Sequence, residues 1–262
     1  MRRKTSLRLR LLAALVAPVA VAHAGQTNWL DIESRIQYGY FTEDVRSLKA
    51  LLEPLSSDES GDPLQSYYLG LLTYRLTQLA EGGTATASGK SLASADRNVA
   101  REMAESCVSA LERSLARQND FADALALESA CLGQQAQLGG WRAPLAGPKS
   151  TSLLRKALQV APRNPRVLLI DAVRDYQHSK AAAGDAGHAC GKFKKATALF
   201  EAERAQVDQV PGWGAAEAYT WLGRCYLDSG DTLTARDALE RALLIAPEFS
   251  QARRLLTTLT SG

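Results

Sequence analysis

The side chains of this sequence with the clearest potential for chemistry are its cysteines and histidines. His188 stands two residues before Cys190, and His178 lies one short segment upstream. An imidazole beside a thiol can activate a nucleophile, and the two residue types together are ligands for zinc. However, only these two histidines follow residue 24, and the evenly spaced ligands of a zinc site are absent. We therefore expect neither a metal ion nor a thiol catalyst here.

Other catalytic patterns are also missing from the sequence. It contains no nucleophile elbow, no phosphate-binding loop and no zinc-protease motif. Its carboxylates are scattered as on solvated helix faces, and Glu128, which interrupts an apolar helical pattern, is explained by a shift that turns it to solvent. We expect a chain that is not an enzyme and has no cofactor.

Residues 1–24 have the organisation of an export signal. Five basic residues precede the apolar run Leu11–Val21, and the small-x-small triplet Ala22-His23-Ala24 follows it. This order predicts a signal peptide cleaved after Ala24. The alternative, a retained membrane anchor, needs about 20 apolar residues, roughly twice this run. We expect a periplasmic or secreted protein without stable membrane insertion after cleavage.

The basic charge of the chain belongs to this signal. Removing its five basic residues changes the formal charge from +3 to −2. A nucleic-acid partner then loses its main support, because the mature chain has no net positive charge. We therefore expect no nucleic-acid partner.

The remaining sequence is helical in pattern. No stretch alternates apolar and polar residues as a half-buried strand does. Helix starts are marked by Asp62-Pro63 and Asn164-Pro165, which combine a capping side chain with Pro at the first helical position. Gly230-Asp231 marks one helix ending and the next beginning. These signals predict an all-α chain of antiparallel helix pairs.

One segment near the C-terminus carries a recognisable repeat. Its pattern consists of small and apolar residues at fixed spacing: Tyr219, Leu222-Gly223, Tyr226, Gly230, Ala235, Leu239, Ala242 and Pro247. It resembles the tetratricopeptide repeat (TPR), which is built from two helices that approach closely at the small residues. The resemblance implies a right-handed α-solenoid of antiparallel helix pairs. Together with the export signal, it suggests an exported TPR protein of a Gram-negative bacterium.

Weaker copies of this pattern extend the prediction along the chain. "SLLRKALQVAP" before Pro162 and "ALERSLARQNDF" at 110–121 repeat the second helix, while "YYLGLLTY" and "LLIDAVRDY" repeat the first. We predict helix pairs at residues 63–118, 120–162, 165–207 and 215–247, followed by a terminal helix from 249. These form a repeat domain over 62–262, after an N-terminal helical cap over 25–61 in which 28–58 supplies a helical pair. Loop insertions rich in Gly, Ser and Ala are expected near 80–94, 138–149 and 181–191.

The cysteines extend the same prediction. Four cysteines in an exported chain favour two disulfides with three possible pairings, and buried free thiols are the alternative. In stacked repeats, the second helix of one pair contacts the first helix of the next. The resemblance therefore implies that Cys107 pairs with Cys131 and Cys190 with Cys225.

The resemblance also implies a binding surface. First helices of TPR proteins line a concave groove that holds a peptide or a partner's segment. Carried over by position, the groove residues are Tyr67, Leu71, Tyr74, Arg75, Ala126, Ala130, Gln134, Ile170, Arg174, His178, Thr220, Arg224 and Leu227. We expect a non-catalytic scaffold or assembly factor with a protein or peptide partner in the cell envelope. The alternative is an accessory subunit of an envelope enzyme or transport system with a small-molecule site among the helices.

Overall fold

The computed structural model describes residues 28–57, 61–82, 94–182, 184, 187–204 and 210–260. The predicted signal peptide lies outside these residues. All regular structure in the described ranges is helical, so the predicted all-α class is confirmed. None of the described helices combines the length and apolar character needed to cross a membrane.

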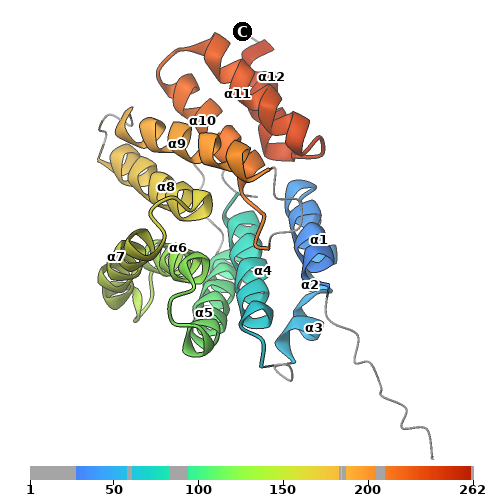
Figure 1. Cartoon of the computed structure of the whole chain (residues 1–262), viewed down its shortest axis with the longest axis vertical. Coiled ribbons are helices and arrows are strands. Elements are labelled where there is room, and N and C mark those ends of the chain that lie inside the picture. Colours follow the sequence, from blue (N-terminus) through green and yellow to red (C-terminus); the bar gives the residue numbers. More distant parts are fainter. Residues whose placement is uncertain are drawn as a thin grey trace, which may run out of the picture.

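Four antiparallel helix pairs form the body of the molecule (Figure 1). Their bounds are α4 (Pro63–Gly82) with α5 (Ser94–Arg117), α6 (Ala122–Leu138) with α7 (Ala143–Val160), α8 (Pro165–Ala181) with α9 (Gly187–Glu203), and α10 (Ala215–Asp228) with α11 (Thr232–Ile245). The terminal helix α12 spans Ser250–Thr260 and packs on α10 and α11.

The capping residues read from the sequence begin these helices. The Asn164 side chain accepts hydrogen bonds from the backbone N–H groups of Arg166 and Val167 at the start of α8. Asp62 accepts one from Leu64, and Asp231 caps α11 through Thr234. Each bond satisfies a backbone donor that has no partner within its helix. Local sequence therefore sets where several helices begin.

Two glycines allow the helices within a pair to approach closely. A Cβ atom added at Gly223 would lie 2.7 Å from Cγ of Leu239, and one at Gly70 would lie 2.6 Å from Cγ of Leu111. Gly223 packs α10 against α11, and Gly70 packs α4 against α5. The first and the last helix pair thus both pack a leucine of one helix closely against a glycine of the other.

Two predicted features differ in the structure. The insertion expected near 138–149 is mostly helical, because α7 begins at Ala143 and continues through Pro148. The one expected near 181–191 is shorter, because α9 begins at Gly187. Pro144 lies in the first turn of α7, where a proline's missing N–H costs least, whereas Pro148 lies inside the helix and removes one of its backbone hydrogen bonds.

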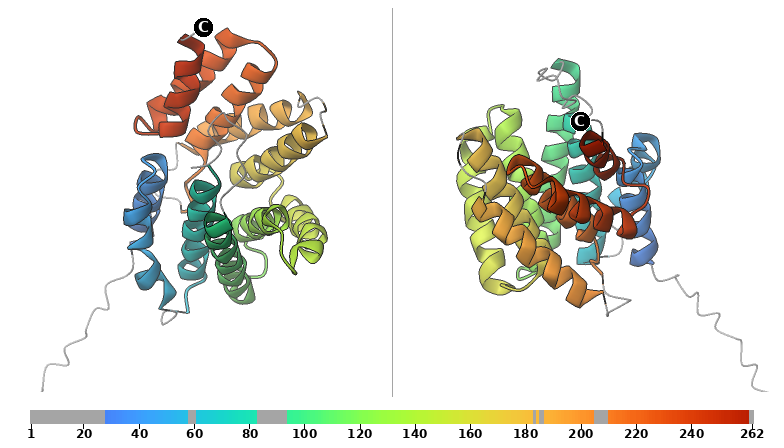
Figure 2. Two further views of the ribbon diagram at one scale, coloured as in Figure 1. Left: turned by 180° about the vertical axis from the view of Figure 1, so that it is seen from behind. Right: turned by 90° about the horizontal axis from the view of Figure 1, so that it is seen from above.

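The N-terminal cap also differs from the expected helical pair. It consists of three short helices, α1 (Trp29–Phe41), α2 (Val45–Lys49) and α3 (Leu52–Ser56), all packed on α4. Tyr40 and Phe41 at the end of α1 reach the other end of the chain and pack with Phe249, at ring distances of 5.8 and 4.4 Å. The array therefore curves until its first and last elements touch, as the two views of Figure 2 show.

Candidate functional site

The predicted groove residues all lie on the inner helices α4, α6, α8 and α10. The structure divides them into residues that the chain itself covers, residues that line a cavity, and two residues, Arg224 and Leu227, that belong to neither group. The covered set, which is almost fully buried, is Tyr67, Leu71, Arg75, Ala126 and Thr220.

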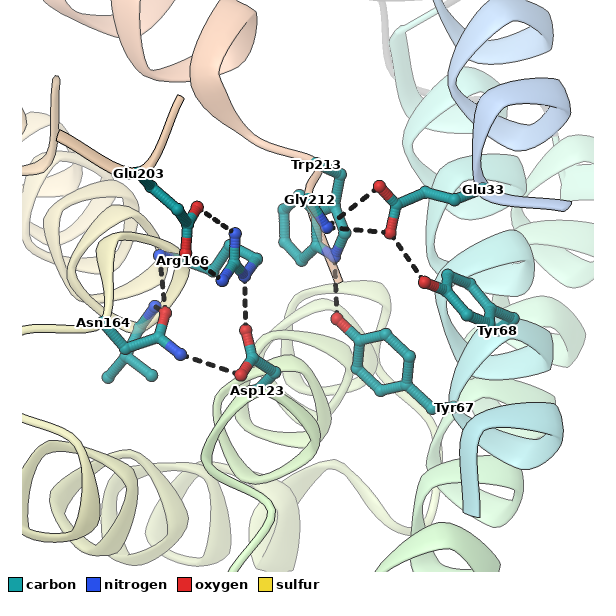
Figure 3. Close-up of polar contacts among 10 residues, drawn as sticks. Glu33, Tyr67, Tyr68, Asp123, Asn164, Arg166, Glu203, Gly212 and Trp213 are labelled. Atoms are coloured by element: carbon teal, nitrogen blue, oxygen red, sulfur yellow. Dashed lines mark hydrogen bonds and ion pairs between the residues drawn. The ribbon is translucent and has the colours of Figure 1, made fainter. Parts of the chain in front are cut away.

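The segment before α10 covers Tyr67. Trp213 is buried, and its indole Nε1 donates a hydrogen bond of 2.7 Å to the Tyr67 hydroxyl (Figure 3). Beside it, the backbone N–H of Gly212 donates to the Glu33 carboxylate, which also accepts from the Tyr68 hydroxyl at 2.8 Å. Burial raises the pKa of Glu33, and the hydrogen bonds from Tyr68 and Gly212 oppose that rise. The chain's own segment thus occupies this part of the groove.

Arg75 is covered in the same way. Its guanidinium is 2% exposed, forms an ion pair with Glu217 of α10, and donates to Gln37 of α1. It also lies over the Tyr40 ring, 4.1 Å from the centroid. A carboxylate of the chain therefore already occupies Arg75, which the sequence placed in the groove. The contacts of Trp213 with Tyr67 and of Glu217 with Arg75 are together called the closure.

A second polar cluster lies next to the closure, at the start of α8 (Figure 3). The Arg166 guanidinium binds Asp123 of α6 at 2.5 Å and both oxygens of Glu203 of α9, at 2.7 and 2.8 Å. Asn164, the helix cap, donates to the second oxygen of Asp123 at 2.8 Å. Every charge here has a partner, so the cluster joins three helices and offers little to a ligand.

Six other predicted residues line a cavity of about 370 Å³. They are Tyr74, Ala130, Gln134, Ile170, Arg174 and His178. Arg224 and Leu227 are half-buried and lie outside the lining, and the Arg224 guanidinium stacks over the Trp221 ring at 5.0 Å. The cavity falls within the size range of small-ligand sites, about 300–1,000 Å³.

The cavity contains polar atoms without partners. Oε1 of Gln134 and Nε of Arg174 are buried and accept or donate no hydrogen bond among the described residues. Nε2 of Gln134 donates to Glu81 at 3.4 Å, and a terminal nitrogen of Arg174 lies 3.7 Å from Asp171. Burial raises the pKa of Glu81 to about 7, against the effect of the Gln134 bond. Two residues of the lining therefore carry buried polar atoms that lack a partner among the described residues, one acceptor and one donor.

Sequence reasoning missed Glu81, Gln78 and Trp221 in this lining. Tyr74, Gln78 and Glu81 follow the i, i+4, i+7 spacing of one helix face, which was a usable signal. Because a loop was expected from residue 80, Glu81 was not assigned to that helix face. In the structure, α4 continues to Gly82.

The cysteines lie together as stacking implied. Disulfides join Cys107 of α5 to Cys131 of α6 and Cys190 of α9 to Cys225 of α10, with Cα atoms 6.1 and 5.7 Å apart. Each links a second helix to the first helix of the next pair. Cys190 therefore has no free thiol, and the exposed His188 lies instead 3.2 Å from Asp175.

The explanation given for Glu128 is wrong. Its side chain is 2% exposed rather than turned to solvent. The ammonium of Lys149, on α7, reaches it at 2.8 Å and also binds the exposed Glu112 at 2.6 Å. Glu128 is a buried, paired charge that joins α6 to α7.

Comparison with known proteins gives one match to a family. Residues 216–249 match the sequence model of the tetratricopeptide repeat. No curated protein matches the chain. A crystal structure of a thermophilic TPR protein from Thermus thermophilus is similar at 16% identity and a TM-score of 0.49, covering 88% of this chain and 100% of that one. The matched residues 216–249 cover α10 from Ala216 onward, α11 and the turn between them, and they are similar to a single tetratricopeptide repeat.

Proposed function

We propose that this protein is a non-catalytic interaction scaffold that receives a short segment of a protein partner in the cavity between α4, α6, α8 and α10. The repeat at 216–249 supports the role, because TPR arrays generally act as scaffolds for protein partners. The observation that carries the proposal is the cavity itself, which is lined by six of the predicted groove residues.

The covered part of the groove limits the kind of segment that fits. Tyr67 and Arg75 are bonded to Trp213 and Glu217, so a long segment running along all four inner helices would have to displace them. Tyr74 adjoins Arg75 in sequence, and Trp221 lies one helical turn beyond Glu217, so the closure borders the cavity. A short segment that enters beside His178 and Gln177, which are exposed at the lining, fits without displacing anything.

We place this scaffold in the cell envelope. The pattern of residues 1–24 supports export, and two disulfides are typical of proteins from oxidising compartments. N-terminal sequencing of protein recovered from the periplasm should begin at Gly25. A chain that retains Met1 and stays in the cytoplasm would remove this part of the proposal.

A filled cavity tests the scaffold role. Ala130 is half-buried in the lining, whereas Ala198 is exposed on α9 and matches it in size. Immobilised wild-type protein and Ala198→Trp should capture the same partner from envelope extract, and Ala130→Trp should lose it while its melting temperature stays near that of the control. Equal capture by both variants would show that the partner binds elsewhere.

The cavity also favours a second candidate, an accessory subunit that binds a small molecule. Its volume of about 370 Å³ suits such a ligand as well as it suits a short segment. A metabolite that raises the melting temperature of wild type and Ala198→Trp, but not of Ala130→Trp, would favour this candidate.

A further inference from the structure

We infer that the cavity recognises an amide group flanked by an aliphatic side chain. This inference rests on the proposed function, since it names the chemistry of the occupant of the same cavity. Its starting point is the pair of polar atoms that the chain leaves unmet there.

Gln134 supplies the acceptor. The residue is 8% exposed and lines the cavity, and its buried Oε1 has no partner among the described residues. Its Nε2 donates to a carboxyl oxygen of Glu81 at 3.4 Å. This contact orients the Gln134 amide, so the oxygen is the atom left for an occupant. A buried carbonyl oxygen without a donor is unfavourable, and an N–H group from a ligand would satisfy it.

Arg174 supplies the donor. Its Nε–H has no acceptor among the described residues, and its contact with Asp171 uses a terminal nitrogen at 3.7 Å instead. The two residues that carry these unmet groups come from neighbouring inner helices, α6 and α8, and line one cavity. A carbonyl oxygen of a ligand could accept the hydrogen bond from Nε of Arg174, and an N–H group could donate one to Oε1 of Gln134. An amide carries both groups.

The remaining lining favours an uncharged group with an aliphatic neighbour. Ile170, Val173 and the rings of Tyr74 and Trp221 supply apolar surface. Uncharged hydrogen-bonding side chains complete the lining, namely Gln78, Gln137, Gln177, Ser129 and Thr151. Arg174 and Glu81 bring groups of opposite charge type to the lining. A strongly charged ligand would therefore lack a matching surface.

Amides of this kind come from two sources, the backbone of a partner's segment and a free small amide. N-acetyl-leucinamide serves as the probe, because it has two amides beside one aliphatic side chain. Its matched control is methyl 2-acetoxy-4-methylpentanoate, which keeps the aliphatic group and the carbonyls but has no N–H. Saturation-transfer NMR with the full mature chain compares the two.

We expect the probe to bind wild type and the diester to bind at least about tenfold more weakly, since one lost hydrogen bond to a buried group has about that effect. Gln134→Leu and Arg174→Met should weaken probe binding by a similar factor. The exposed residues of α7 provide the matched controls, Gln159→Leu and Arg155→Met, which should bind as wild type does. A doubly capped leucine dipeptide that binds tighter than the probe points to a partner's backbone, and one that binds no tighter points to a free amide.

Equal binding of the probe and the diester would overturn the amide inference, as would equal binding by Gln134→Leu and Gln159→Leu. Either result leaves the scaffold proposal standing, because capture of the partner by Ala198→Trp and its loss in Ala130→Trp do not depend on the probe. If capture fails to depend on Ala130 while the probe still binds through Gln134, the scaffold proposal fails and the amide site remains.

Discussion

Arg75 of α4 and Glu217 of α10 form a buried ion pair that joins positions 142 residues apart. Gln37 of α1 contacts both partners, so the first cap helix, the first helix pair and the last helix pair meet at one point. We expect Glu217→Ala to lower the free energy of unfolding by about 3–5 kcal/mol, because it leaves a buried guanidinium without its counter-charge. Urea denaturation followed by circular dichroism measures this.

Glu240→Ala is the matched control. Glu240 pairs with Arg236 at 3.6 Å on an exposed face of α11, where such a pair contributes at most about 1 kcal/mol. Equal unfolding midpoints for the two variants would show that the closure between α4 and α10 contributes little to stability.

The helix pairs were predictable because their signals are local. Asn164-Pro165 and Gly230-Asp231 fix helix ends within a few residues, and Gly223 with Leu239 sets the contact within a pair. The disulfide partners follow from the same register, since stacking places each second helix on the next first helix.

The closure and the cavity were not predictable in this way. Repeat register indicates that Tyr67 and Arg75 face the concave side, but it does not say what lies against them. Trp213 and Glu217 reach them only because small rotations between successive pairs add up over the whole array. Repeat register therefore predicts which positions face inward, and only the three-dimensional arrangement separates the covered ones from those lining the cavity.

Substituting the packing glycines should destabilise the protein. Gly223→Leu forces side-chain atoms into the position of Leu239, so we expect a loss of about 1–3 kcal/mol in the free energy of unfolding. Gly191 is the control, because it lies exposed on α9 and a Cβ atom there would meet nothing within 4 Å. Gly191→Leu should leave stability unchanged or raise it by roughly 0.5–1 kcal/mol through helix propensity. A loss of the same size at both positions would contradict the close crossing of α10 and α11.

Glu81 should make stability depend on pH. Burial raises the pKa of Glu81 to about 7, above its ordinary value of 4.5. The folded state thus keeps a proton that the unfolded state has released, and the stability contributed by protonated Glu81 is full below pH 4.5 and lost as pH rises through about 7. Glu81→Gln cannot lose that proton, so its unfolding midpoint should fall less than that of wild type between about pH 5 and pH 8. Glu240→Gln should keep the wild-type pH profile, and a parallel profile for Glu81→Gln would refute the raised pKa.

The disulfides should stabilise the array without being needed for its helices. The bridges Cys107–Cys131 and Cys190–Cys225 close chain segments with sequence separations of 24 and 35. The entropy removed from the unfolded chain corresponds to about 3–4 kcal/mol for each. Reduction should therefore lower the melting temperature, while the far-ultraviolet helical signal at 25 °C stays largely intact, because each pair still buries its own apolar face. Non-reducing peptide mapping of periplasmic protein checks the pairing directly. Peptides that link Cys107 to Cys225, or four thiols that titrate freely, would contradict the stacking of α5 on α6 and of α9 on α10.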